Sequence, residues 1–491
     1  MGANINTGLL KENLKILQNS RSWSDGLIDK LEEFISNSDD YDLFRVNPIR
    51  FSIENDISES DGIDLFLWAS KLNLFEMNWE LLCPACGDHI QSFRHLNTMQ
   101  DKIFCSLCQC ERIAALDDWI QVTFTINSKI RHIRFHQPEN LSINEFIFQY
   151  HFTRDAKAYE GGPEKSRLLG TVTKDTAFIA RLEKETFEFD LQDGLLIVYD
   201  FLNNRGLNLM ISPELSIDGQ DVDITYVKND FEINRPQINS GRVKFTVENK
   251  SDSRLALGLF LIPSEILANM DEDATVIMDP YLDGKKLLTS QTFRDLFRNE
   301  LIQGNEGINV KDLTVLFTDL KGSTELYDRV GDLKAFNLVN QHFESLAKVI
   351  VRNRGAIVKT IGDAVMATFA NPLDSVKAAT EIVEDLNQFN RQHGGENIII
   401  KIGVHKGSSI AVTLNDRLDY FGQTVNVAAR VQGLADAEEI YITDSVYEIE
   451  EIQDEISDYT IIPERAKLKG IQEEMDVYKV LIGNSQSTMS I

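Results

Sequence analysis

The stretch Leu316-Phe-Thr-Asp-Leu-Lys-Gly-Ser-Thr324 decides the fold of the C-terminal part of this chain, together with Lys359-Thr-Ile-Gly-Asp363 further along. Each places an aspartate just after a run of residues that favour a buried strand. Strand-forming residues flank Gly362-Asp363 on both sides, which predicts a hairpin with Asp363 at its tip. Two carboxylates at neighbouring strand ends suit a pair of hard divalent cations, so Asp319 and Asp363 are candidate metal ligands.

Composition limits the class of protein. The chain has 491 residues, which is too long for one hydrophobic core, so we expect roughly two to four domains. Apolar residues make up 43% and charged residues 26%, a globular composition that argues against wholesale disorder. The formal net charge of −28 disfavours nonspecific binding to nucleic acid or to an anionic membrane, because both attract clustered Lys and Arg.

The sequence shows no pattern typical of a membrane-spanning helix, a secretory signal or a myristoylation site. No apolar run approaches the length of about eighteen residues that a membrane-spanning helix needs. The N-terminus has no basic region followed by an apolar core, and Asn6 stands where a myristoylation signal needs Ser or Thr. We therefore expect a cytoplasmic protein without membrane insertion.

Residues 1–80 predict a helical module, because apolar residues recur at helical spacing over 7–37 and again over 63–72. Such a module could resemble a winged helix, whose function would be DNA binding. The acidity of the chain favours a packing or regulatory module instead.

Residues 81–117 predict a zinc ribbon. The pairs Cys83-Pro-Ala-Cys86 and Cys105-Ser-Leu-Cys108 have the separation that lets four thiolates surround one tetrahedral Zn²⁺. The alternative is a set of four buried free cysteines, which behave as small apolar residues. A closed four-thiolate site has no open coordination position, so we expect one structural Zn²⁺ per chain.

Residues 118–265 predict a β-rich regulatory domain, a β-sandwich or small barrel. Alternating or β-branched segments predict strands at 119–126, 145–152, 194–199, 241–247 and 255–262. Residues 248–253 are interpreted as a hairpin loop between the last two. No nucleophile and base are arranged for catalysis here, so we expect a sensor or partner surface whose ligand the sequence does not name.

Residues 266–309 predict a linker with an amphipathic helix over 292–302. That helix could transmit a rotation from the sensor, or it could be a cap on the next domain. Alternating strands and helices over 310–483 indicate an α/β sandwich, and residues 484–491 predict a flexible tail.

Four motifs in the C-terminal third resemble the class III nucleotidyl cyclase family. They are Phe317–Thr324, Lys359–Asp363, Asp419–Arg430 and Leu468–Gly470, in that order. The resemblance implies a cyclase catalytic domain with a ferredoxin-like core. The upstream region is similar to the amino-terminal region that precedes some bacterial cyclase domains.

The resemblance also implies a metal site. Asp319, Asp363 and the main-chain carbonyl of Leu320 would bind two Mg²⁺ or Mn²⁺ ions. The turn that leads to Thr324 opens a helix, so its backbone N–H groups could bind phosphate oxygens of the substrate.

The choice of base follows from Lys359 and Asp419. Adenine presents an acceptor at N1 and a donor amine at N6, so it needs one donor and one acceptor from the protein. Lys359 donates and Asp419 accepts, whereas guanine would turn both contacts unfavourable. Guanylyl relatives typically carry Glu and Cys at these positions, so ATP is the expected substrate.

The remaining residues imply a shared site. Asn426 would orient the ribose, Arg430 would neutralise charge on the α-phosphate, and Lys469 would bind the β- and γ-phosphates. In the family, the metal aspartates come from one subunit and the base-binding and transition-state residues from its partner. One chain that holds both sets predicts a homodimer. The alternatives are a guanylate cyclase, a catalytically silent nucleotide-binding regulator and a zinc-dependent DNA-binding factor.

Overall fold

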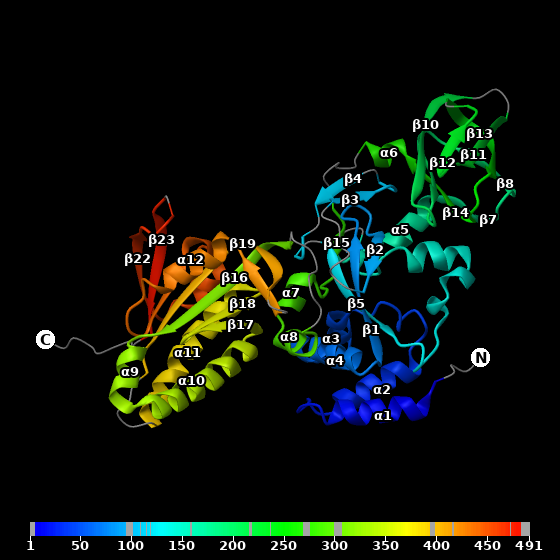
Figure 1. Cartoon of the computed structure of the whole chain (residues 1–491). Coiled ribbons are helices and arrows are strands. Elements are labelled where there is room, and N and C mark those ends of the chain that lie inside the picture. Colours follow the sequence, from blue (N-terminus) through cyan, green and yellow to red (C-terminus); the bar gives the residue numbers. More distant parts are fainter. Residues whose placement is uncertain are drawn as a thin grey trace.

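A computed structural model gives the fold of the chain (Figure 1). It describes residues 5–94, 102–108, 110–113, 115–117, 119–157, 160–215, 219–235, 237–268, 275–298, 307–392, 398–414, 417–471 and 473–482. The predicted tail at 484–491 lies outside these residues.

The chain begins with helices that pack on a small antiparallel sheet. The helices are α1 (Thr7–Gln18), α2 (Leu27–Asn37), α3 (Pro48–Glu54) and α4 (Glu59–Lys71). The sheet has the order β2-β1-β5, with β1 (Phe75–Leu82), β2 (His89–Phe93) and β5 (Ile120–Ile126). Leu31, Phe66 and Trp79 are fully buried in their common core. The predicted helices are confirmed, whereas these elements do not establish a winged helix.

Each cysteine pair lies at the connection between two strands. Cys83 and Cys86 follow β1, while Cys105 ends β3 (Lys102–Cys105), which pairs with β4 (Cys110–Ile113). Short elements come next in the chain: η2 (Arg134–His136), η3 (Pro138–Asn140), η4 (Glu145–Tyr150), β6 (Ala156–Lys157) and α5 (Lys165–Val172).

The predicted strand at 145–152 is wrong, because η4 is a helical turn of the π type. Ser142 Oγ accepts a hydrogen bond from the backbone N–H of Glu145 at 3.3 Å, and the Glu145 carboxylate accepts one from the backbone N–H of Ser142 at 3.1 Å. This reciprocal capping box starts a helix and outweighs the β propensity of the aromatic residues that follow.

The β-rich region forms one eight-stranded sheet in the order β12-β11-β13-β10-β9-β14-β7, with β8 paired to β13. Its strands are β7 (Thr173–Ile179), β8 (Lys184–Leu191), β9 (Gly194–Asp200), β10 (Arg205–Leu215), β11 (Gln220–Val227), β12 (Asp230–Ile233), β13 (Ile238–Asn249) and β14 (Leu255–Pro263). Leu196, Val243 and Leu257 are buried in a core of its own. Strand pairing joins all eight strands into one sheet, so two separate sheets are not established. The β-sandwich therefore stays a prediction.

The predicted hairpin at 248–253 is also wrong. β13 pairs with β8, β10 and β11, whereas β14 pairs with β7 and β9. The Asn249 side-chain amide donates to the carbonyl oxygens of Ile179, Ala180 and Ser253. These contacts fix the loop where it crosses from β13 to β14, which lie at different positions in the sheet.

The linker contains α6 (Ser264–Leu267), β15 (Ile277–Met278), α7 (Gly284–Leu288) and α8 (Gln291–Leu296). The predicted helix at 292–302 is therefore present in its first part, and residues 299–302 lie outside the described residues. In Figure 1, α7 and α8 lie between the N-terminal helices and the C-terminal sheet.

The C-terminal part is an α/β sandwich. Its sheet has the order β17-β18-β16-β19-β21-β23-β22, with β20 paired to β19. The strands are β16 (Ile308–Leu320), β17 (Gly355–Ile361), β18 (Ala364–Phe369), β19 (Ile400–Leu414), β20 (Arg417–Phe421), β21 (Glu439–Thr443), β22 (Thr460–Ala466) and β23 (Met475–Leu481). The helices are α9 (Ser323–Val330), α10 (Asp332–Arg352), α11 (Pro372–Gln392), α12 (Gln423–Gln432), α13 (Asp444–Tyr447) and α14 (Glu450–Glu455). The βαββαβ order of β16 to β19 is that of the expected ferredoxin-like core.

The two faces of this sheet are covered differently. Leu316 of β16 faces α10 and α11, where it joins Leu346 and Ile382 in one core. Its neighbour Phe317 points to the opposite face, because side chains alternate along a strand. That face belongs to the core of the N-terminal region, which includes Phe293 of α8.

Candidate active site and its relatives

The two predicted metal-binding aspartates lie at one edge of the C-terminal sheet. Thr318 of β16 is opposite Val365 of β18, so Asp319 reaches the level of the turn that joins β17 and β18. Asp363 is in that turn, and the preceding Gly362 has φ of 65°, a conformation that glycine adopts without strain. The predicted hairpin with Asp363 at its tip is confirmed.

The electrostatics of this metal pair, Asp319 and Asp363, suit divalent cations. Partial burial and the charge of Asp363 raise the pKa of Asp319, while Lys401 and a hydrogen bond from the Gln432 side chain partly offset the shift. A cation between the carboxylates would relieve their repulsion. The residues present therefore fit the metal ions that the motif implies.

The chain turns sharply after the first aspartate. Leu320 ends β16, and Gly322 has φ of 71°, which lets helix α9 start at Ser323. The Lys321 ammonium pairs with Asp436. Thr324 lies in the first turn of α9, but its side chain is outside the described residues.

The predicted base-contact pair, Lys359 and Asp419, is together in this one chain. Lys359 Nζ lies 2.6 Å from Asp419 Oδ2, and Asp419 Oδ1 accepts a hydrogen bond of 2.8 Å from the backbone N–H of Tyr420. Asp419 is buried, while the Lys359 side chain is 36% exposed. A donor and an acceptor thus stand side by side at a position that solvent can reach.

Helix α12 carries Asn426 and Arg430 one turn apart on one side. Asn426 is exposed and Arg430 is half-buried. The guanidinium of Arg430 packs against Gly470, where an added Cβ would come within 3.3 Å of Nη2. Lys469 is exposed next to it. The structure therefore brings Arg430 to the loop that carries Lys469.

The metal pair and the predicted ribose- and phosphate-binding residues form two separate sets. In the part of the chain that the structure describes, no hydrogen bond or ion pair joins the metal pair to Asn426, Arg430 or Lys469. Gln432 is the α12 residue that reaches Asp319. The sequence did not identify Gln432, because a single glutamine at a helix end carries no motif.

The four predicted zinc ligands do meet. The Sγ atoms of Cys83, Cys86, Cys105 and Cys108 all lie within 4.8 Å of one another. Cys83 and Cys108 are 3.2 Å apart and Cys86 and Cys105 are 3.8 Å apart, measured between Sγ atoms. Four thiolates at 2.3 Å from a tetrahedral Zn²⁺ would be about 3.8 Å apart, so the cluster fits the ion.

Comparison with known protein families agrees with this geometry. Residues 308–481 match the family model described as adenylate and guanylate cyclase catalytic domain, and residues 10–295, more than half of the chain, match a family of unknown function named DUF5939. The chain belongs to the DUF5939 family and carries a class III cyclase catalytic domain. The recognition made from the four motifs is confirmed.

Individual curated relatives match part of the chain. An adenylate cyclase of Anabaena cylindrica is 31% identical over 198 residues, 36% of this chain and 39% of that protein. Adenylate cyclase 2 of Rhizobium meliloti is 31% identical over 156 residues, 29% of this chain and 42% of that protein. The chain thus spans about two fifths of these relatives' length. A solved guanylate cyclase domain of Catenaria anguillulae RhGC with GTP is 26% identical, covers 35% of this chain and 97% of its own, and has a TM-score of 0.32.

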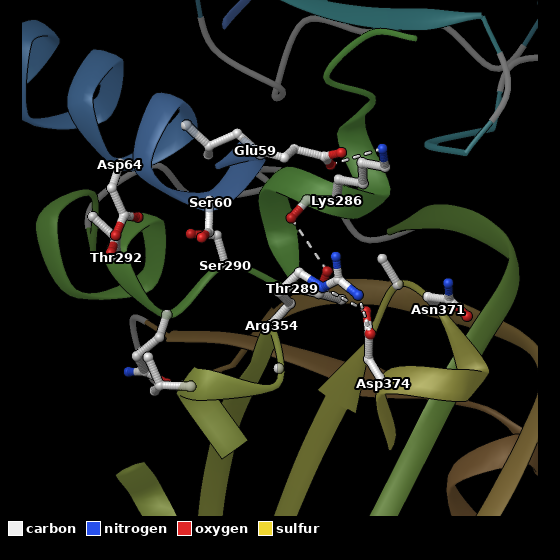
Figure 2. Close-up of a pocket in the computed structure, with 15 residues that line it drawn as sticks. Glu59, Ser60, Asp64, Lys286, Thr289, Ser290, Thr292, Arg354, Asn371 and Asp374 are labelled. Atoms are coloured by element: carbon white, nitrogen blue, oxygen red, sulfur yellow. Dashed lines mark hydrogen bonds and ion pairs between the residues drawn. The ribbon is translucent and has the colours of Figure 1, made fainter. Parts of the chain in front are cut away.

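A cleft of about 200 Å³ lies between the cyclase domain and the upstream region (Figure 2). Glu59 pairs with Lys286 on the upstream side, and Arg354 pairs with Asp374 on the cyclase side. The described lining includes none of the predicted nucleotide or metal residues. The cleft lies at the Gly355 end of β17, about 20 Å along the strand from its Asp363 end, so it is distinct from the candidate active site.

Within the described residues, no helix is long and apolar enough to cross a membrane.

Proposed function

We propose that this protein is an adenylate cyclase that converts ATP to 3′,5′-cyclic AMP and pyrophosphate. The observation that carries the proposal is the contact of 2.6 Å between Lys359 Nζ and Asp419 Oδ2. This places an ammonium donor and a carboxylate acceptor at neighbouring positions, which matches N1 and the N6 amine of adenine. A guanine base would present a hydrogen to the ammonium and a carbonyl to the carboxylate, and a site with unpaired polar groups discriminates strongly.

The reaction requires the ribose 3′-hydroxyl to attack the α-phosphorus in line, with pyrophosphate as the leaving group. Two Mg²⁺ or Mn²⁺ ions on Asp319, Asp363 and the Leu320 carbonyl would lower the pKa of that hydroxyl and neutralise the triphosphate. Asn426 orients the ribose, and Arg430 stabilises the charge that develops on the α-phosphate. Lys469, on the loop that packs against Arg430, binds the β- and γ-phosphates together with the backbone turn before Thr324.

Class III cyclases act as dimers, and we propose a homodimer for this chain. Within the described part of one chain, no hydrogen bond or ion pair joins the metal pair to Asn426 or Arg430, which supports a site assembled from two chains. Each dimer then holds two equivalent sites, each with the metal pair of one subunit and the base-contact and α12 residues of the other. The upstream region, with its structural Zn²⁺, regulates this dimer through α7 and α8, which contact the cyclase sheet.

The test is product analysis with the purified chain. ATP or GTP is incubated with Mg²⁺ or Mn²⁺, and products are separated by chromatography, with Arg430→Ala as the inactive control. Cyclic AMP from ATP in preference to cyclic GMP from GTP is the expected result. Cyclic GMP as the main product would establish the alternative of a guanylate cyclase. Absence of both products from folded protein would favour a silent nucleotide-binding regulator.

A further inference from the structure

Strand β20, which carries Asp419, is an edge strand. Among the described strands it pairs with β19 alone, with Val412 opposite Asp419. An edge strand has a row of backbone groups that no neighbouring strand binds. Contacts to this edge from outside the sheet therefore help to set the position of Asp419, together with its bond to Lys359.

The α7–α8 segment, residues 284–296, makes those contacts. Arg294 Nη2 donates a hydrogen bond of 2.6 Å to the carbonyl oxygen of Leu418, and the Tyr420 hydroxyl donates one of 3.3 Å to the carbonyl oxygen of Leu288. Leu418 and Tyr420 are the two chain neighbours of Asp419. The Tyr420 side chain is 2% exposed, and the Arg294 guanidinium carbon lies 6.0 Å from the centre of its ring. The segment thus holds the backbone of Leu418 and the side chain of Tyr420, on the two sides of the carboxylate.

The same segment binds the strand that carries Lys359. Gln291 Oε1 accepts a hydrogen bond of 2.9 Å from the backbone N–H of Ile357. The pairing of β17 with β18 shifts between Ile357 and Lys359, and such a bulge re-aims the side chains that follow it. The segment therefore anchors β17 at the start of the bulge that sets the direction of Lys359.

We propose that Arg294 is a positioning residue for recognition of the nucleotide base. Through the Leu418 carbonyl it holds β20, and with it Asp419, in the position that pairs the carboxylate with Lys359. Base selectivity then depends on residues outside the cyclase domain, because Arg294 belongs to the linker that precedes it. This inference rests on the proposed role of Lys359 and Asp419 in base recognition.

The test compares full-length variants in steady-state kinetics with ATP and GTP. Arg294→Ala should raise KM for ATP and lower the ratio of kcat/KM for ATP to that for GTP about tenfold or more, because a small displacement of a binding group is costly. Arg298→Ala is the matched control, since Arg298 is exposed just beyond α8. Arg294→Lys keeps a charged donor and should recover most of the selectivity.

Two further variants keep the inference testable if Arg294→Ala does not fold. Tyr420→Phe keeps the buried ring and removes the hydroxyl, which bonds the Leu288 carbonyl oxygen and also contacts Thr368 and Arg294, so it should lower selectivity in the same direction as Arg294→Ala. If Arg294→Ala unfolds, Tyr420→Phe and Arg294→Lys carry the comparison. A fall in kcat that is equal for both nucleotides, with an unchanged selectivity ratio, would overturn the positioning role, and so would kinetics identical to those of Arg298→Ala.

A binding measurement separates this inference from the proposed function. Fluorescent analogues of ATP and GTP are titrated into each folded variant. If the unsubstituted chain forms no cyclic nucleotide, the proposed activity fails, yet the ratio of dissociation constants still tests Arg294. A ratio that is the same in the unsubstituted chain and Arg294→Ala would then reject the inference.

Discussion

Mixing two inactive variants tests whether the active site is shared between chains. Asp319→Ala removes a metal ligand, and Arg430→Ala removes the guanidinium on α12. Each variant alone should lose most of its activity, about 10²-fold or more, because each removes a group that stabilises charge in the transition state. In a heterodimer, one site collects both defects and the other site has neither.

The size of the recovery follows from the symmetry of the dimer. With equal amounts of two freely exchanging chains, about half of the dimers are heterodimers, and each has one intact site of two. The mixture should therefore show about a quarter of the unsubstituted activity, and heterodimers purified through two different affinity tags should show about half.

The control uses two variants from the same set of residues. Asp319→Ala and Asp363→Ala both remove metal ligands, and the metal pair of each site belongs to one chain. Every site in their heterodimer keeps one defect, so activity should stay at the level of the single variants. Cyclic AMP formation is measured in each sample, with dimer formation checked by light scattering. Recovery in this control, or none in the Asp319→Ala and Arg430→Ala heterodimer, would refute the shared site.

Three further predictions follow from the structure. The double substitution Lys359→Glu and Asp419→Cys should reverse the hydrogen-bonding pattern offered to the base. It should lower kcat/KM for ATP relative to GTP by about 10³-fold or more. An unchanged preference in product chromatography would contradict the role of this pair in base recognition. Metal analysis should find one zinc per chain, and Cys105→Ser should lose it and lower Tm by about 5–10 °C; a chain that is free of zinc and equally stable would contradict the site. Burial lowers the pKa of His342 to about 4, so the unfolded chain binds more protons than the folded chain below pH 6.5. This group should therefore lower the free energy of unfolding, measured in urea, by about 2 kcal/mol between pH 7 and pH 5. The substitution His342→Leu should remove that pH dependence.

The hairpin at Asp363 and the cysteine cluster were predictable because each of them rests on a short local motif. Asp363 occupies a two-residue turn, and turn geometry follows from the local residues Gly362 and Asp363. The cysteine pairs are similar, since each C-x₂-C loop places two sulfur atoms together wherever the two loops meet. Local sequence therefore indicated the hairpin and the cysteine cluster before the fold was considered.

Other features depend on packing that the local sequence does not determine. Residues 145–152 are rich in aromatic side chains that favour strands, but the capping contacts of Ser142 and Glu145 favour a helix. Residues 248–253 have the composition of a hairpin loop, but the Asn249 amide ties them across the sheet. Arg294 lies in a plain amphipathic stretch, and its bond to Leu418 joins residues 124 positions apart. No periodicity or motif in the sequence marks that contact.

The contact between Lys359 and Asp419 has a consequence for the order of events when a nucleotide arrives. In the free protein, each of these groups already has an oppositely charged neighbour, so an incoming base competes with the protein itself. A base that bonds to only one of these two groups leaves the other with a weaker partner than before. Its binding then gains little free energy relative to the free protein. If this pair binds the base as proposed, adenine inserts its edge and returns a contact to each group. Selection then occurs by exchange of partners, and a base with the wrong hydrogen-bonding pattern is rejected because the ion pair of the free site is the better alternative.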